Sequence, residues 1–388
     1  MDINFFPVPQ IELLFTEKCN LNCTYCFEHN KLNRSMNLDE ILSLTQKKGI
    51  SSRSFYMFGG EPMLAMDIIT GLIDSVNAQT DISEATKSEL LSGLTFHITN
   101  GTLLKQNLDI IKKYGMSIQI SVDGPKEIND ANRVYHDGRG SFNEVYEAIK
   151  LCHDEKIPWS IHGAVGVDTI KNLFEITKFY FDVYYKYESM DKAIGVLKGN
   201  IYQLMFEGNY TDEDVNELLS QFSMIVDWIW TTKDYNLTSD QRRTMFINWC
   251  TRRGSSCFVG DTLYSMDAEY NLYPCHRLAM SEYRKTFSLG NMKETIRDFD
   301  NYEIFNSITK MHKDNCMFSS AINVIEWDSP LYWMNWCPAT NSETHLSPYY
   351  QASKYNVIIA ELNSFIPELA HYYGVDIDVL EKRVKERN

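Results

Sequence analysis

The sequence has few of the features that mark membrane or exported proteins. It contains no run of about eighteen apolar residues, the length that a membrane-spanning helix needs. Its first residues, MDINFFPVPQ, lack the basic segment and apolar stretch of a secretory signal peptide. We therefore expect a cytoplasmic protein that does not bind a membrane.

Positive charge is also scarce. The 388 residues include 37 Lys and Arg against 52 Asp and Glu, which gives a formal net charge of −15. Proteins bind a phosphate backbone mainly through clustered Lys and Arg, so we expect no nucleic-acid partner. The chain is long enough for one large domain and a smaller one.

Cysteine, by contrast, occurs at nine positions. In a long chain without an export signal, cysteines favour metal binding or catalysis over a disulfide framework. One N-terminal loop holds Cys19, Cys23 and Cys26, whereas Cys152 stands alone and is expected to be buried. The other five follow residue 249: Cys250, Cys257, Cys275, Cys316 and Cys337.

Strand-like and helix-like segments alternate through the first half of the chain. This alternation predicts an α/β fold with a parallel sheet, and its six repeats predict a partial (β/α)6 barrel with functional residues at the carboxyl ends of the strands. Two capping boxes, Asn37 with Glu40 and Ser141 with Glu144, predict helix starts. The predicted strands are 10–15, 54–58, 94–99, 117–122, 158–165 and 201–206, and the predicted helices are 38–48, 62–78, 103–114, 141–152 and 169–184.

The pattern changes after residue 207. Residues 212–232 predict a bridging helix, and the part rich in Cys, Asn and Trp that follows contains only short predicted strands, at 262–266 and 271–274. We predict four parts: a barrel at 1–210, a bridging helix within 211–249, a small cysteine-rich module at 250–345, and a helical segment at 346–388.

The N-terminal cysteine loop has the spacing C-x3-C-x2-C. Four-iron clusters usually take four cysteine ligands, so three thiolates on one loop leave one iron with an open position, which a chelating amino acid can fill. Cysteine loops of other spacing bind zinc, which is the alternative for this loop.

This spacing, with Tyr25 before the last cysteine, resembles the radical S-adenosylmethionine (radical SAM) superfamily. Three further motifs resemble the family in the same order: GGEP at 59–62, SVDGP at 121–125 with Arg133 downstream, and GRGSF at 138–142. The resemblance implies a [4Fe–4S] cluster on the three cysteines and bound S-adenosylmethionine. It also implies reductive cleavage of that cofactor to a 5′-deoxyadenosyl radical, which abstracts hydrogen from an unactivated carbon.

The resemblance also implies cofactor contacts. Glu61 would accept a hydrogen bond from the cofactor's amino group, Gly59 and Gly60 would let the backbone approach it, Ser121 would contact the ribose, and Arg133 would pair with the carboxylate. Tyr25 is a candidate catalytic residue. Asn100 is expected near the same ligand, and backbone near Val165 and Val167 is expected to hold the adenine.

The cysteine-rich module resembles the SPASM or twitch-like iron–sulfur extension of radical SAM enzymes. In that family the cysteines bind auxiliary clusters, usually two, but the dense C-x2-C-x5-C-x3-C run is largely missing here and Tyr270 replaces a usual Gly. The count is consistent with one auxiliary [4Fe–4S] cluster. A zinc knot or buried thiols is the alternative. The implied ligands are Cys250, Cys257, Cys275 and Cys337, with Cys316 as an alternative fourth ligand.

His276 directly follows Cys275, where related sulfatase maturases carry an Asp believed to act as a base. His276 is therefore a candidate base, and a packing role is the equal alternative. The string YPCHRL at 273–278 is more similar to maturases that make thioether or carbon–carbon crosslinks in ribosomal peptides. His97, His136 and His162 are expected to be structural.

The leading hypothesis is therefore hydrogen abstraction from a ribosomally synthesised peptide to install a thioether or carbon–carbon crosslink, with the auxiliary cluster accepting an electron. One alternative is peptide epimerisation, for which Cys316 could donate hydrogen. A second is formylglycine formation in a sulfatase, and a non-enzyme alternative is an iron–sulfur electron carrier or sensor.

The expected partners follow from this chemistry. They are the peptide, an electron donor such as flavodoxin or ferredoxin, and a separate leader-peptide-binding protein. The last is expected because only eighteen residues precede Cys19 in this sequence, too few for the winged-helix module of many relatives. The alternative is that the substrate docks on the barrel mouth and on the region 180–245. The aromatic stretch 179–187 could form such a surface, although its spacing favours a core helix.

Overall fold

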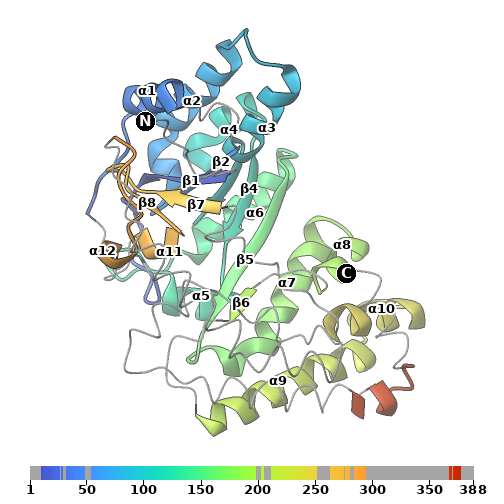
Figure 1. The fold of residues 1–388 in the computed structure, drawn as a ribbon. Helices are drawn as coiled ribbons and strands as arrows, with labels where there is room; N and C mark the ends of the chain where they lie inside the picture. Colours follow the sequence, from blue (N-terminus) through green and yellow to red (C-terminus); the bar gives the residue numbers. More distant parts are fainter. Residues whose placement is uncertain are drawn as a thin grey trace.

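The computed structural model describes residues 10–26, 28, 32–48, 54–197, 202–204, 211–250, 263–274, 276–279, 284–293, 367–368 and 370–376 (Figure 1). The predicted ligands Cys257, Cys275, Cys316 and Cys337 lie outside these residues, as does most of the predicted module at 250–345. The division of the chain into four parts therefore stays a prediction.

Six parallel strands follow the predicted positions and confirm the α/β barrel class. They are β1 (Gln10–Thr16), β2 (Ser54–Gly59), β3 (Phe96–Thr99), β4 (Ser117–Ser121), β5 (Trp159–Val165) and β6 (Tyr202–Leu204). One sheet has the order β2-β1-β7-β8 and the other has the order β3-β4-β5-β6. β3 contacts β2 across the junction between the two sheets, so the strands form one curved wall.

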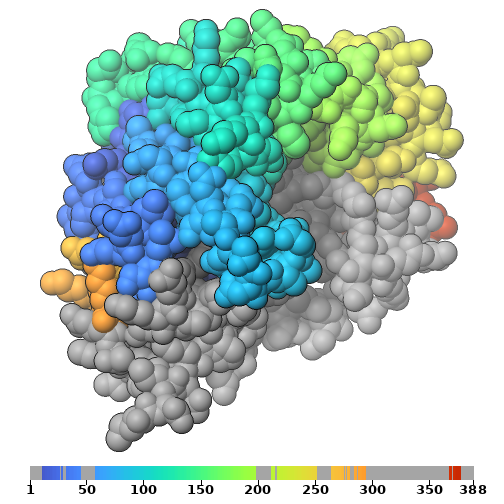
Figure 2. Space-filling model, turned by 90° about the horizontal axis from the view of Figure 1, so that it is seen from above, coloured from blue at the N-terminus to red at the C-terminus, as the bar shows by residue number. Residues whose placement is uncertain are grey.

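The C-terminal strands extend this wall. β7 (Leu263–Met266) pairs parallel with β1, and β8 (Leu272–Tyr273) returns antiparallel to β7. These strands match the two short ones predicted for the cysteine-rich module. A segment some 250 residues away in the sequence thus lies next to the first strand of the barrel. Figure 2 shows it against the N-terminal residues, at the opposite end from α9 and α10.

Helices cover the outer face of the wall. The predicted helices are confirmed, although those at 62–78, 103–114 and 169–184 begin as 3-10 turns at Pro62–Ala65, Lys105–Asn107 and Ile170–Asn172. Further helices that the patterns did not predict lie between and after them. The helices are α1 (Leu38–Lys48), α2 (Met66–Ala78), α3 (Glu84–Leu94), α4 (Leu108–Lys113), α5 (Lys126–Asn132), α6 (Phe142–Asp154), α7 (Leu173–Tyr187), α8 (Met190–Val196), α9 (Asp212–Thr231), α10 (Ser239–Cys250), α11 (His276–Ala279) and α12 (Arg284–Phe287).

The two predicted capping boxes had different outcomes. Asn37 caps α1, because its side-chain oxygen accepts from the backbone N–H of Glu40 at 3.1 Å. The prediction of a capping box at Ser141 is wrong, because the Ser141 side chain does not cap α6. Its hydroxyl instead donates to the backbone oxygen of Arg133 at 2.8 Å. The N–H of Phe142 at the start of α6 is satisfied by the Asp130 carboxylate, 2.8 Å away.

The two faces of the wall differ in polarity. On β4, Ile118 and Ile120 are buried among the covering helices, whereas Ser117, Gln119 and Ser121 alternate with them and are half-buried. Because side chains alternate across a strand, these polar residues share the inner face. The inner face is therefore the side of the wall suited to a polar ligand.

The remaining predictions on the described helices concern burial. Tyr180, Phe181, Tyr184 and Tyr187 of α7 are buried, which confirms that the aromatic stretch is core. Cys152 is buried in α6, and burial raises the pKa of its thiol to about 12. No helix among the described residues has the length and apolar character needed to cross a membrane.

Candidate active site

The cysteine loop follows β1 and is held by backbone contacts to the last residue of α5 and to the segment after it. The N–H of Asn22 donates to the oxygen of Val134 at 2.7 Å, and that of Thr24 donates to the oxygen of Asn132 at 3.0 Å. Cys19, Cys23 and Cys26 are all half-buried. The loop is thus shaped by the protein around thiols that a ligand can reach.

Asn100, predicted near the cofactor, lies beside this loop. Its amide nitrogen is 2.9 Å from the side-chain oxygen of Asn20 and 3.9 Å from the sulfur of Cys19. Its side-chain oxygen accepts from the hydroxyl of Thr102 at 2.6 Å. The end of β3 and the start of the cysteine loop are therefore joined by one amide network.

The paired glycines are required by the packing of β2 against the end of β1. Gly59 has a φ of +148°, and a Cβ there would collide with the carbonyl oxygen of Thr16. A Cβ on Gly60 would collide with the backbone oxygen of Lys18 and lie 2.7 Å from that of Glu17. The two glycines thus allow the end of β2 to lie close to the backbone after β1. The sequence had predicted only a close approach of the glycine backbone to the cofactor.

Glu61 is buried and ties the ends of two strands together. One carboxylate oxygen accepts from the hydroxyl of Thr99 at 2.7 Å and from the N–H of Met63 at 3.0 Å. The other accepts from the N–H of Asn100 at 2.8 Å. Burial raises the pKa of Glu61 even though these donors favour its charged form. Its predicted contact with the cofactor's amino group stays a prediction.

Tyr25 and Arg133 meet at a carboxylate that the sequence interpretation missed. The Tyr25 hydroxyl donates to Asp123 at 2.6 Å, and the Arg133 Nε lies 3.0 Å from the other oxygen of Asp123. That oxygen also accepts from the N–H of Ala164 at 3.0 Å. Burial opposes the charge on Arg133, but Asp123, Tyr25 and Cys23 together hold its pKa above the ordinary value. Asp123 directly follows the predicted strand 117–122, and this position could have identified it as a candidate site residue.

The other predicted contacts lie at the carboxyl ends of neighbouring strands. Ser121 is the last residue of β4 and pairs in register with His162 of β5. Val165 is the last residue of β5, and Val167 is partly buried in the turn that follows. The structure thus brings the motifs of β1 to β5 to one edge of the wall, as predicted.

His276 reaches the inner face of β1. Its Nδ1 lies 2.7 Å from the Glu12 carboxylate, and its ring stacks on Phe58 with centroids 3.9 Å apart. The Ser265 hydroxyl donates to the same carboxylate at 2.7 Å. Burial alone would raise the pKa of Glu12, but His276 and Ser265 hold it below the ordinary value. The sequence interpretation missed Glu12. It could have been found because it is the one carboxylate within a mostly apolar strand.

Of the predicted auxiliary ligands, the structure describes Cys250, and it also describes the turn at Tyr270. Cys250 is the last residue of α10 and is buried, which raises the pKa of its thiol. Tyr270, in place of the usual Gly, adopts a φ of +70° and bonds through its hydroxyl to the backbone of Asn37, at 3.1 and 3.2 Å. The tyrosine therefore completes the turn by anchoring it to the barrel. The auxiliary ligand set stays a prediction.

The cysteine loop suits a four-iron cluster. Cys19, Cys23 and Cys26 are half-buried on one loop, which backbone hydrogen bonds from Asn22 and Thr24 anchor. Each of the three thiolates would bind a different iron of the cluster, and the fourth iron would keep an open position.

Comparison with known proteins agrees with this geometry. Residues 13–179 match the Radical SAM superfamily. A cysteine-type anaerobic sulfatase-maturating enzyme of Clostridium perfringens is 25% identical over 336 residues, which span 79% of this chain and 85% of that enzyme. The radical SAM cyclopropyl synthase TigE of Paramaledivibacter caminithermalis is 23% identical over 185 residues, 42% of this chain and 36% of TigE.

A solved structure shares the fold. The structure described as native anSMEcpe with bound AdoMet and Cp18Cys peptide has a TM-score of 0.52 and 18% sequence identity, covering 92% of this chain and 100% of that one. Residues 13–179 of this chain form a radical SAM domain, whose cofactors are a [4Fe–4S] cluster and S-adenosylmethionine.

Proposed function

We propose that the protein is a maturase that removes hydrogen from a ribosomally made peptide and installs a thioether or carbon–carbon crosslink. The observation that carries the proposal is the position of His276. It belongs to the C-terminal YPCHRL string, yet it stacks on Phe58, next to the Gly59-Gly60 turn. A residue of the C-terminal region therefore lies beside the radical SAM motifs, where a substrate side chain would react.

The bound cofactors supply hydrogen-atom abstraction from an unactivated carbon, and the rest of the reaction falls to the protein. Joining a thiol to a carbon that has lost a hydrogen atom releases one proton and one electron. We assign the proton to His276, which Glu12 and Ser265 hold in place. Cys250, Cys257, Cys275 and Cys337, with Cys316 as the alternative ligand, would hold an auxiliary cluster that could accept the electron.

Positioning falls to the Tyr25, Asp123 and Arg133 group. Asp123 joins the cysteine loop to the chain after α5, so it fixes where the loop presents its thiols. Arg133 is the proposed partner of the cofactor carboxylate, and Ser121 and Glu61 are the proposed contacts for its ribose and amino group. Such pre-formed contacts favour a reaction because they remove the cost of orienting the reactants.

Formylglycine formation is the second candidate. The sulfatase-maturating enzyme of C. perfringens aligns with 79% of this chain, well beyond the radical SAM domain, which supports it. His276 at the place of the maturase Asp counts against it. Epimerisation, with Cys316 as hydrogen donor, stays a further alternative.

The proposed partners are a peptide and an electron donor such as flavodoxin or ferredoxin. The anSMEcpe structure, which has the same fold as this chain, is described as containing the Cp18Cys peptide. A separate leader-peptide-binding protein is a further proposed partner.

The products separate the candidates. The reconstituted enzyme is incubated anaerobically with S-adenosylmethionine, a reductant and either a sulfatase cysteine peptide or a short peptide encoded beside its gene. Crosslinking removes two hydrogen atoms from the peptide and consumes a thiol or a C–H bond. A new aldehyde that reacts with a hydrazine would instead establish formylglycine formation. A peptide mass that is unchanged in ordinary water, and that rises by one deuterium at an α-carbon in heavy water, would establish epimerisation.

A further inference from the structure

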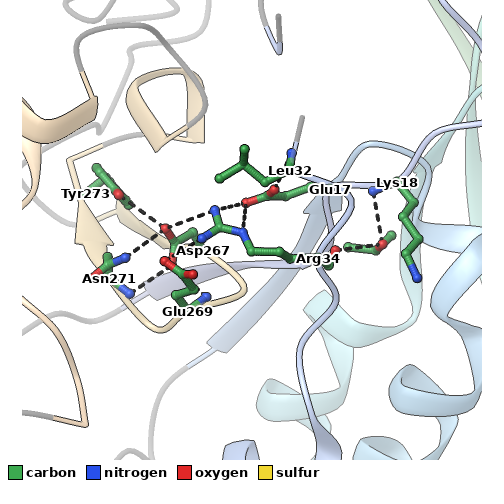
Figure 3. Close-up of polar contacts among 9 residues, drawn as sticks. Glu17, Lys18, Leu32, Arg34, Asp267, Glu269, Asn271 and Tyr273 are labelled. Atoms are coloured by element: carbon green, nitrogen blue, oxygen red, sulfur yellow. Dashed lines mark hydrogen bonds and ion pairs between the residues drawn. The ribbon is translucent and has the colours of Figure 1, made fainter. Parts of the chain in front are cut away.

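A line of buried and part-buried polar side chains runs from the cysteine loop to the C-terminal hairpin (Figure 3). At one end is Glu17, which directly follows β1, stands two residues before Cys19 and is fully buried. Its carboxylate accepts from the N–H of Leu32 at 2.8 Å and from the Nε of Arg34 at 3.0 Å. The backbone N–H of Glu17 also donates to the oxygen of Arg34 at 2.9 Å.

The other end of the line organises the turn between β7 and β8. Asp267 is 1% exposed. One of its oxygens accepts from the N–H groups of Glu269 and Asn271, both at 2.9 Å. The other accepts from the Tyr273 hydroxyl at 3.2 Å. Tyr273 is itself buried and stands two residues before Cys275, so Asp267 holds the approach to that cysteine.

Arg34 joins the two ends. Its guanidinium pairs with Glu17 through Nη2, which also lies 3.9 Å from Asp267, and with Glu269 through Nη1. Burial opposes its charge, but the surrounding carboxylates raise the pKa of Arg34, so it stays protonated. A buried carboxylate without a counter-charge is costly, and Arg34 supplies that charge at both ends.

We infer that Arg34 is a positioning residue that couples the cysteine loop to the hairpin leading to Cys275 and His276. Through the line Glu17, Arg34, Asp267 and Tyr273, the placement of one segment depends on that of the other. The coupling determines how the S-adenosylmethionine-binding cluster lies relative to the C-terminal residues of the site. It does not depend on which substrate the enzyme modifies.

The chain offers a matched control. Lys293 and Glu40 form an ion pair of 2.8 Å that also joins the region after the hairpin to the region after the cysteine loop. Both side chains are well exposed, at 43% and 48%. Water screens such a pair, so its loss should affect neither segment.

The test compares Arg34→Gln, Asp267→Asn and Glu40→Gln in the reconstituted holoenzyme. The readouts are the electron paramagnetic resonance spectrum and the midpoint potential of the cluster whose signal changes when S-adenosylmethionine is added. We expect Asp267→Asn, on the hairpin, to shift both readouts in the same direction as Arg34→Gln. Glu40→Gln should match the wild type. A wild-type spectrum and potential in Asp267→Asn would overturn the inference.

A second measurement applies if a variant fails to hold its cluster. In the metal-free chain, the rate at which a maleimide labels Cys19, Cys23 and Cys26 reports local opening of the loop. We expect Asp267→Asn to raise this rate about tenfold, because loss of a coupled contact favours opening. An unchanged rate in Asp267→Asn, equal to that of Glu40→Gln, would overturn the inference.

Discussion

The two sheets of the molecule are assembled from different ranges of the sequence. In the sheet β3-β4-β5-β6, each strand pairs with its neighbour along the chain. In the sheet β2-β1-β7-β8, β1 pairs with a strand from the C-terminal region. The first sheet holds its part of the site by contacts at adjacent strand ends. The second adds part-buried polar pairs between distant residues, such as Glu12 with His276 and Arg34 with Asp267.

The difference explains which parts of the site the sequence could predict. Strand periodicity and the motifs that follow each strand are local, so Ser121, Asn100 and Arg133 were placed at the right edge of the wall. Glu12 and Arg34 were missed because their partners lie in the C-terminal hairpin, and no local pattern states that β7 pairs with β1.

The sequence patterns missed α3 and α5 for a related reason. Both helices have too few regularly spaced apolar residues for a clear period. α3 is stabilised by packing on β2, and α5 by packing on α6. The Ser141 capping box failed because Asp130, from the preceding helix, satisfies the N–H at the start of α6. Tertiary contacts decided each of these cases.

The largest expected effect is on the long-range sheet. Arg34→Met leaves the carboxylates of Glu17 and Asp267 buried without their counter-charge, so the free energy of unfolding should fall by about 3–5 kcal/mol. Lys150→Met, which removes an exposed pair with Glu147 beside the local sheet, should change it by less than about 0.5 kcal/mol. Anaerobic urea unfolding measures both. Equal losses would remove the distinction between the two sheets.

The local sheet should show its own pH dependence through His97 of β3. Burial lowers the pKa of His97 to about 4, against 6.5 for an ordinary histidine. The unfolded chain then binds a proton first as the pH falls, so the free energy of unfolding should drop between pH 6.5 and 4, by about 3 kcal/mol in all. His97→Met should flatten this part of the curve. An unaltered curve would show that His97 is not the titrating group.

Gly60→Ala tests the junction between the strands β1 and β2. The added Cβ would meet the backbone oxygens of Lys18 and Glu17, and overpacking of this kind costs about 1–3 kcal/mol. The variant should also bind less iron at the cysteine loop, because Lys18 precedes Cys19. Gly195→Ala, where the added Cβ meets no atom within 4 Å, is the control and should keep both stability and iron.

The smallest expected effect is at the part-buried hydroxyl of Tyr25. Tyr25→Phe removes one hydrogen bond to Asp123, so the free energy of unfolding should fall by about 1.5 kcal/mol. Arg133 keeps its ion pair with Asp123 in this variant. S-adenosylmethionine binding, measured by titration calorimetry, should therefore weaken only slightly. Complete loss of binding would show that Tyr25 contacts the cofactor directly.

The most direct test of the account measures iron and acid-labile sulfide per chain after anaerobic reconstitution, in the wild type and in a variant with Cys19, Cys23 and Cys26 changed to Ala. The account predicts one cluster on the loop and one in the C-terminal region, so about eight irons should fall to about four. About four irons falling to none, with zinc bound in the C-terminal region, would contradict it, because the proposed crosslinking would then have no exit for its electron.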